Sequence, residues 1–162
     1  MMTLYGKASP VPAPYAGIAD FVLDLPADRP LRILQLTDMQ IIDASQQRTP
    51  NRLNEREIAL WQPEDIPAQC TDQIRSVVAQ ANPDLMIITG DVIYGEFDDS
   101  GRSFGLFCDF MDSFCIPWAP VYGNHDNESR MGVDWQNARF EASPYCLFRK
   151  GSTAGNGNYS VL

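Results

Sequence analysis

The sequence predicts an α/β fold, in which strands alternate with helices along the 162-residue chain. Two apolar runs of strand length, residues 85–89 and 118–122, each follow a segment whose apolar side chains have helical spacing. Three predicted strands end abruptly at a polar or glycine-rich turn, which is where α/β proteins place their sites. Because 44% of the residues are apolar and 20% are charged, we expect one globular domain over residues 1–162.

The first part of the chain reads as an extended segment followed by two strands. Residues 1–16 contain three prolines, each lacking an amide donor, so an extended lead-in is expected there. Residues 21–25 resemble a strand, residues 26–30 a turn, and residues 31–37 a second strand that stops at Asp38. We therefore expect these two strands to pair as a hairpin.

A polar stretch, residues 44–68, follows the second strand and indicates a surface excursion with a short helix over residues 51–60. Arg48, Arg52 and Arg56 recur every four residues, so on a helix they would share one face. Such a face can bind a phosphate group, but a solvated helical face is the more common explanation, and we favour it.

The next two elements are predicted from the spacing of apolar residues. Thr71 is a candidate N-cap, and the side chains after it recur at the intervals of a helix lying on a sheet. These side chains are Ile74, Val77, Val78 and Ala81. Asn82 and Pro83 end this helix, and the continuous apolar run over residues 85–89 is typical of a strand buried on both faces.

The same pattern of helix and strand recurs in the second half of the chain. Residues 104–114 are predicted to form a buried helix, and residues 118–122 a short strand that leads into the turn 123–126. Residues 159–162 look like the start of one more strand. The polar turns after the three predicted strands, at the carboxyl ends of an α/β sheet, should converge.

Composition excludes several classes of partner. Twelve Lys and Arg against 21 Asp and Glu give a formal charge of −9, which argues against binding to a nucleic-acid backbone. Because no run is long and apolar enough to span a membrane and no secretory leader is evident, we expect a cytoplasmic protein without a membrane partner. The cysteines are expected to be buried free thiols, with Cys108 and Cys115 on one helix face.

Hard oxygen donors and one imidazole stand at the ends of the predicted strands. Asp38 ends the first strand, Asp91 follows a glycine after the second, and Asn124 precedes the only histidine, His125. Such a set suits Zn, Mn, Fe or Mg rather than soft-metal chemistry. An isolated aspartate at a strand end is more often a turn or cap residue, so the combination carries the argument.

Three short motifs follow one another at these strand ends. They are Leu36-Thr37-Asp38, Gly90-Asp91 and Gly123-Asn124-His125-Asp126. Together they make the chain resemble the calcineurin-like metallophosphoesterase superfamily over residues 31–126. The resemblance implies the N-terminal portion of a four-layer α/β/β/α sandwich with mixed β-sheets, here in truncated form.

The resemblance also implies a role for each motif residue. Asp38 would bind one metal ion, Asp91 would bridge two, and Asn124 would bind the other. His125 would lie near the phosphate and protonate the leaving oxygen or stabilise the transition state, with Asp126 orienting or polarising it. The complete family site holds two divalent or mixed-valence metal ions, which are Fe, Mn or Zn.

The first motif departs from the widespread Asp-x-His form, because Met39 and Gln40 follow Asp38. Purple acid phosphatases lack the same histidine, and their Gly-Asp-x-x-Tyr motif resembles residues 90–94. Their tyrosine binds ferric iron as a phenolate, which makes Tyr94 a further candidate metal ligand. The alternative is an aromatic packing residue.

The family also needs a later lone histidine and a Gly-His-x-His segment, and this sequence has neither. The resemblance therefore implies a phosphomonoesterase or phosphodiesterase, acting on a phosphate ester, whose metal site is incomplete in this chain. Two classes stay open. One is a hydrolase whose missing ligands come from a complementing C-terminal chain, and the other is a catalytically inactive, metal-poor scaffold module.

Overall fold

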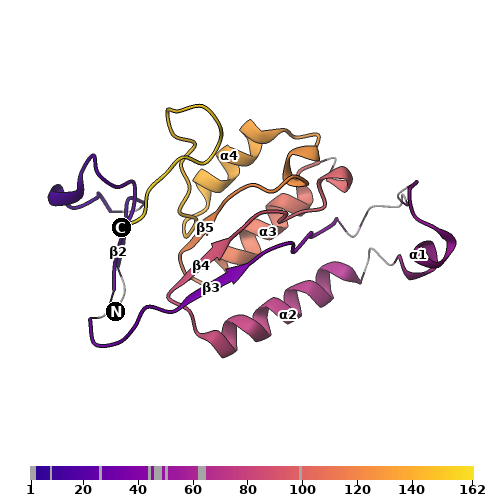
Figure 1. Ribbon diagram of the computed structural model, residues 1–162, viewed down its shortest axis with the longest axis horizontal. Helices are drawn as coiled ribbons and strands as arrows, with labels where there is room; N and C mark the ends of the chain where they lie inside the picture. The colour runs from indigo at the N-terminus through magenta and orange to yellow at the C-terminus, as the bar shows by residue number, and fades with distance from the viewer. Residues whose placement is uncertain are drawn as a thin grey trace.

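The computed structural model describes residues 3–7, 9–25, 27–43, 45, 49, 51–61, 65–98 and 100–162. At its centre lies a three-stranded parallel sheet in the order β3-β4-β5 (Figure 1). The strands are β3 (Ile33–Leu36), β4 (Leu85–Ile88) and β5 (Trp118–Pro120), and each lies within a predicted strand. Because all three run parallel, the turns that follow them lie along one edge of the sheet.

Helices cover one face of this sheet and form the main core with it. Helix α2 (Ile66–Ala81) connects β3 to β4, α3 (Arg102–Asp112) connects β4 to β5, and α4 (Val133–Ala142) follows β5. The buried side chains come from the helices and from alternate sheet positions, and include Ile74, Val78, Phe104, Phe107, Met111, Phe140, Met86, Ile88 and Trp118. A one-residue slip of a strand would expose its buried set, so this core fixes the register.

The predicted hairpin between residues 21–25 and 31–37 is wrong. Strand β2 (Val22–Asp24) pairs antiparallel with β1 (Thr3–Tyr5), which lies inside the segment expected to be an extended lead-in. Strand β3 pairs with β4 instead, and in this pairing Leu34 and Leu36 pack against the helix-covered core. A parallel bridge from Phe21 to Val161 makes the small sheet mixed and places the predicted last strand beside β2.

Helix α1 (Glu55–Leu60) begins four residues later than the predicted start of the helix over residues 51–60. Asn54 forms a capping box at this point, because its Oδ1 accepts the Glu57 amide at 3.0 Å while the Glu57 carboxylate accepts the Asn54 amide at 2.9 Å. Three short 3-10 helices complete the described elements, η1 (Ala13–Tyr15), η2 (Gly95–Phe97) and η3 (Asp126–Glu128).

Helix α2 begins five residues before Thr71, so the predicted N-cap is wrong. The Thr71 hydroxyl donates to a carbonyl one turn earlier at 3.0 Å, as a residue inside a helix can. Asn82 ends the helix with a left-handed φ of 43°, as the sequence predicts. Of the predicted apolar stripe, Ile74 and Val78 are buried, whereas Val77 is 43% exposed.

The cysteines are free, but two of them do not share the predicted face. Cys108 and Cys146 are buried and Cys70 is partly buried, whereas Cys115 is exposed. Cys115 lies beyond the end of α3 with a left-handed φ of 54°, so it no longer follows the helical repeat that places Cys108 inside. The prediction that they lie on one face is therefore wrong.

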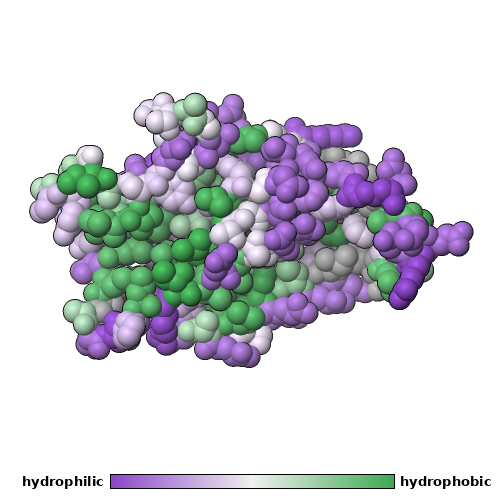
Figure 2. Space-filling model, viewed as in Figure 1, coloured by the Kyte–Doolittle hydropathy of each residue, from purple (hydrophilic) through white to green (hydrophobic). Residues whose placement is uncertain are grey.

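The other face of the central sheet is covered in part, where Phe21 and Leu147 pack with Leu85, and is open beside β3. Ile33 of β3 lies opposite Leu85 on this face and is 51% exposed, and Leu31 and Val121 beside the sheet are 44% and 48% exposed. Figure 2 shows hydrophobic side chains gathered over the sheet on the viewed side. Among the described residues, no helix combines the length and the apolar character needed to cross a membrane.

Candidate active site

The backbone segment that follows β3 runs beside the one that follows β4. The amide of Asp38 donates to the carbonyl of Gly90 at 3.2 Å, and the amide of Gln40 donates to the carbonyl of Asp91 at 2.9 Å. A parallel bridge further along extends this pairing beyond the strands themselves. The first two predicted motifs are therefore held together by main-chain hydrogen bonds.

Both turns use backbone conformations that residues with a β-carbon rarely adopt. The φ angles are 53° at Asp38, 44° at Gln40 and 50° at Asp91, beside 96° at Gly90. Each such non-glycine residue costs on the order of 1–3 kcal/mol and persists only where the surrounding structure imposes it. This strain is concentrated at the ends of β3 and β4, and clustering of that kind is characteristic of functional sites.

The third turn packs directly against the second. A β-carbon on Gly123 would lie 2.1 Å from Oδ1 of Asp91, and one on Gly90 would lie 2.5 Å from the amide nitrogen of Gly123. The amide of His125 donates to the same Asp91 Oδ1 at 2.9 Å. The two glycines thus allow the Asp91 carboxylate to reach the turn that carries Asn124 and His125, and the three turns meet.

Asp126 is fully buried, and its carboxylate joins the second and third turns. It accepts the amides of Asp91 and Val92 at 2.9 Å each and the amide of Gly123 at 2.7 Å. Burial raises the pKa of Asp126, while these amide hydrogen bonds act in the opposite direction. Its described partners are thus backbone amides, so Asp126 links the two turns, and the expected orienting role toward His125 stays a prediction.

The described partner of the His125 ring is Glu128, three residues later. Nδ1 of His125 lies 2.8 Å from Oε2 of Glu128, and that hydrogen bond raises the pKa of His125. An ionised carboxylate only accepts hydrogen bonds, so Nδ1 carries the hydrogen and Nε2 is left to take or release a proton. Sequence reasoning missed Glu128, although its position three residues after the histidine was an available signal.

Replacing Glu128 by glutamine is expected to lower the pKa of His125 in metal-free protein toward the ordinary value of about 6.5. Proton NMR titration can follow the imidazole directly, because His125 is the only histidine. Since the folded pKa is raised, the pair stabilises the fold fully below the unfolded pKa, and that stabilisation is lost as pH rises through the folded pKa.

The free energy of unfolding, measured in urea, should therefore decline in the wild type as pH rises from the unfolded to the folded pKa of His125. The decline should be smaller in Glu128→Gln. An identical histidine titration in both proteins would show that some other group sets the protonation of the ring.

The three predicted ligand residues differ in exposure. Asp38 and Asn124 are exposed at their turns, whereas Asp91 is 8% exposed. Their oxygens are hard donors, which suit the predicted metals in kind. Within the part of the chain that the structure describes, no three His, Cys, Asp or Glu side chains gather as a metal cluster. The donors therefore fit such ions in type and fall short of the usual four ligands in number.

Tyr94 belongs to an aromatic cluster beside the second turn. Its ring stacks on Phe97 with centroids 5.3 Å apart and an interplanar angle of 11°, and its centroid lies 5.3 Å from that of His125 and 6.4 Å from that of Trp61. Tyr94 lines one cavity, and Asp38 lines a different one beside α2. These ring contacts are typical of a packing residue, and metal ligation by Tyr94 stays a prediction.

One of the three predicted arginines reaches this cluster. The guanidinium of Arg52 lies 5.3 Å from the centroid of the Tyr94 ring and pairs with the Glu96 carboxylate at 2.6 Å. Arg52 precedes α1, so it cannot share a helical face with the exposed Arg56. Arg48 lies outside the described residues.

The chain matches the model of a known protein family. The family model of the calcineurin-like phosphoesterases matches residues 31–159. The chain is 30% identical over 105 residues to probable inactive purple acid phosphatase 29 of Arabidopsis thaliana, which covers 60% of this chain and 24% of that protein.

Two further relatives are named for different functions. The chain is 33% identical over 89 residues to the DNA double-strand break repair protein Mre11 of Nanoarchaeum equitans, covering 52% of this chain and 23% of that protein. It is 33% identical over 95 residues to phosphatase DCR2 of Saccharomyces cerevisiae, covering 53% and 16%. The matched stretches thus span about a quarter or less of these relatives.

Proposed function

The chain belongs to the calcineurin-like phosphoesterase family, and from that membership we propose that its three strand-end turns are part of a metal-dependent phosphoester hydrolase site. The observation that carries this proposal is the contact between the second and third turns. There the Asp91 carboxylate accepts the amide of His125, while both turns are held by the buried carboxylate of Asp126.

Four residues of this chain are candidates for binding the metal ions. Asp38, Asp91 and Asn124 are the proposed ligands, with Tyr94 as a further candidate. When bound, such ions polarise phosphoryl oxygens as Lewis acids. The choice among Fe, Mn and Zn is open.

Hydrolysis needs one proton at the leaving oxygen, and His125 is the proposed donor. In the proposed reaction, the oxygen of water bonds to phosphorus, the water releases one proton to solvent, and the bond from phosphorus to the alcohol oxygen breaks. The departing oxygen takes the proton held at Nε2 of His125, because Nδ1 is engaged by Glu128. His125 regains a proton from solvent after the reaction. In metal-free protein, the hydrogen bond to Glu128 raises the pKa of His125, so more of the ring is protonated near neutral pH.

Further ligands are needed, and we propose that a complementing segment of the family domain supplies them. The open apolar face of the central sheet supports this, because Ile33 and Val121 stay about half exposed where a second layer could cover them. The alternative is a metal-poor scaffold without activity. It is favoured by the small number of clustered ligands among the described residues.

The purified 162-residue chain is expected to turn over an aryl phosphate slowly or not at all with added Mn, Zn or Fe, since one histidine cannot complete two metal shells. Activity should appear when a second chain carrying the later histidine motifs of the family is added, and Asp91→Asn should abolish it. Turnover by the chain alone that is lost in Asp91→Asn would contradict the incomplete site. A mixture that stays inactive while retaining no metal after dialysis would favour the scaffold.

A further inference from the structure

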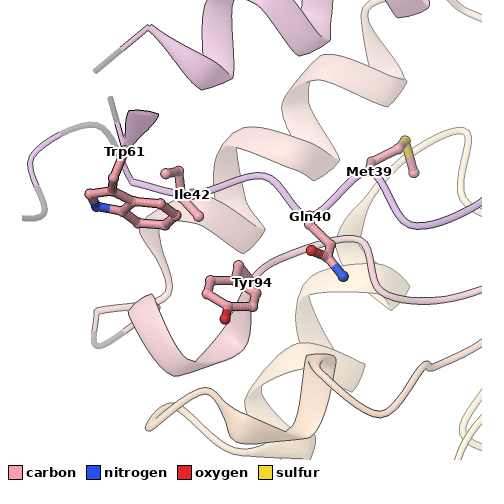
Figure 3. A pocket seen from close by; sticks show the side chains of 5 residues that line it. All are labelled: Met39, Gln40, Ile42, Trp61 and Tyr94. Atoms are coloured by element: carbon pink, nitrogen blue, oxygen red, sulfur yellow. The ribbon is translucent and has the colours of Figure 1, made fainter. Parts of the chain in front are cut away.

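A cavity of about 310 Å³ lies beside the candidate site and shares Tyr94 with it. It is lined by Met39, Gln40, Ile42, Trp61 and Tyr94. Figure 3 shows that the first three come from the segment that follows β3, whereas Trp61 and Tyr94 come from two other parts of the chain. Among the described lining residues, Trp61 and Tyr94 supply aromatic rings, while the Gln40 amide, the Tyr94 hydroxyl and the unpartnered indole N–H of Trp61 supply polar groups.

Two contacts connect this cavity to the reacting groups. The amide of Gln40 donates to the carbonyl of Asp91 at 2.9 Å, so one wall is fixed to the second motif. The Tyr94 ring, which forms another wall, lies 5.3 Å from the His125 ring, centroid to centroid. A molecule in the cavity would therefore contact the Tyr94 ring, whose neighbour is the imidazole that is proposed to protonate the leaving oxygen.

The charges around the cavity favour a neutral occupant. Arg52 lies over the Tyr94 ring at 5.3 Å, and its guanidinium is already paired with the Glu96 carboxylate at 2.6 Å. That pairing neutralises the cation, so it does not make this wall an anion site. What the cavity presents is the thioether of Met39, the aliphatic chain of Ile42 and the faces of two aromatic rings.

The size of the cavity limits the occupant to a small organic group. Ligand pockets run from about 300 to 1,000 Å³, and an apolar space of about 150 Å³ already accepts benzene. A cavity of about 310 Å³ therefore has room for one or two fused rings.

We propose that this cavity binds the apolar, ring-bearing alcohol portion of a phosphoester substrate. The inference rests on the proposed hydrolase function, because it assigns the cavity to the group that leaves from phosphorus. Trp61 and Tyr94 provide faces for the ring, while the Gln40 amide can meet a polar substituent. The site is thereby selective for an aryl or similarly apolar phosphoester over a glycerol or sugar ester.

Binding of the alcohol alone tests this without requiring turnover. 2-Naphthol is titrated into the full 162-residue chain and followed by ligand-observed NMR, with glycerol as the polar comparison. We expect saturable binding of 2-naphthol, weaker by about tenfold in Trp61→Ala and largely restored in Trp61→Phe, because ring stacking contributes that much. Leu60→Ala is the matched control, since Leu60 neighbours Trp61, is 72% exposed and does not line the cavity.

The outcomes separate this inference from the function on which it rests. If the affinity for 2-naphthol is unchanged in Trp61→Ala, or if glycerol binds equally well, the cavity assignment is overturned even if phosphoesters are hydrolysed. Binding that follows Trp61 as expected supports the cavity even if no hydrolysis is found, in which case the proposed function fails alone. Circular dichroism of each variant confirms that a loss of binding is not a loss of fold.

Discussion

Replacing Asp126 by alanine is expected to destabilise the fold by about 3–5 kcal/mol. The carboxylate is fully buried and accepts amides from the second and third turns, at 2.7 to 2.9 Å for the shortest three. Its removal leaves those amides without an acceptor inside the protein, and each buried unsatisfied donor costs on the order of 1–3 kcal/mol. Urea denaturation measures the loss as a lower midpoint with an unchanged slope.

Asn127→Ala is the control for this experiment, because Asn127 is the exposed neighbour of Asp126 and should change stability by less than about 0.5 kcal/mol. If Asp126→Ala cost as little as this control, the carboxylate would not be the link between the turns. The loss of stability in Asp126→Asn should lie between those of Asp126→Ala and Asn127→Ala. The asparagine amide keeps one acceptor oxygen, but its NH₂ group would face backbone N–H groups, which are also donors.

The substitution Gly123→Ala is expected to produce the second large effect. Its new β-carbon would lie 2.1 Å from Oδ1 and 2.4 Å from the backbone nitrogen of Asp91, so the second and third turns must separate. Overpacking of this kind costs about 1–3 kcal/mol, and it should also break the hydrogen bond from the His125 amide to Asp91. Thermal unfolding and the chemical shift of the His125 amide report the two consequences.

A glycine elsewhere in the chain supplies a control of opposite sign. Gly105 lies within α3, and a β-carbon there meets nothing within 4 Å. Gly105→Ala should therefore stabilise the protein by about 0.5–1 kcal/mol, because alanine restricts the unfolded chain and favours the helix. If Gly123→Ala behaved like Gly105→Ala, the close approach of the two turns would be incorrect.

The parallel sheet could be predicted from sequence because its elements carry strong local patterns. The continuous run that becomes β4 and the helical spacing in α2 and α3 each identify their element without reference to the rest of the chain. The pairing of β2 with β1 could not be predicted in this way. Both are three-residue strands, and their pairing depends on contacts distant in sequence.

The site was predicted in part for a related reason. The motif residues Asp38, Asp91 and His125 stand at strand ends, and parallel strands necessarily bring such ends to one edge. The partners of the motif side chains were not predictable, because the direction of a side chain depends on local turn geometry. The carboxylate of Asp126 faces backbone amides, and that of Glu128 lies against the imidazole.

The central claim is that Asp38, Asp91 and Asn124 form part of a cation site next to His125, and paramagnetic broadening by Mn²⁺ tests it most directly. The single imidazole gives one set of ring signals, so broadening reports the approach of the ion to His125. We expect these signals to broaden on titration of the 162-residue chain, and Asp91→Asn to require about tenfold more Mn²⁺ for the same effect, because a carboxylate ligand is lost. Equal broadening in the wild type and in Asp91→Asn, or none at millimolar Mn²⁺, would contradict the site.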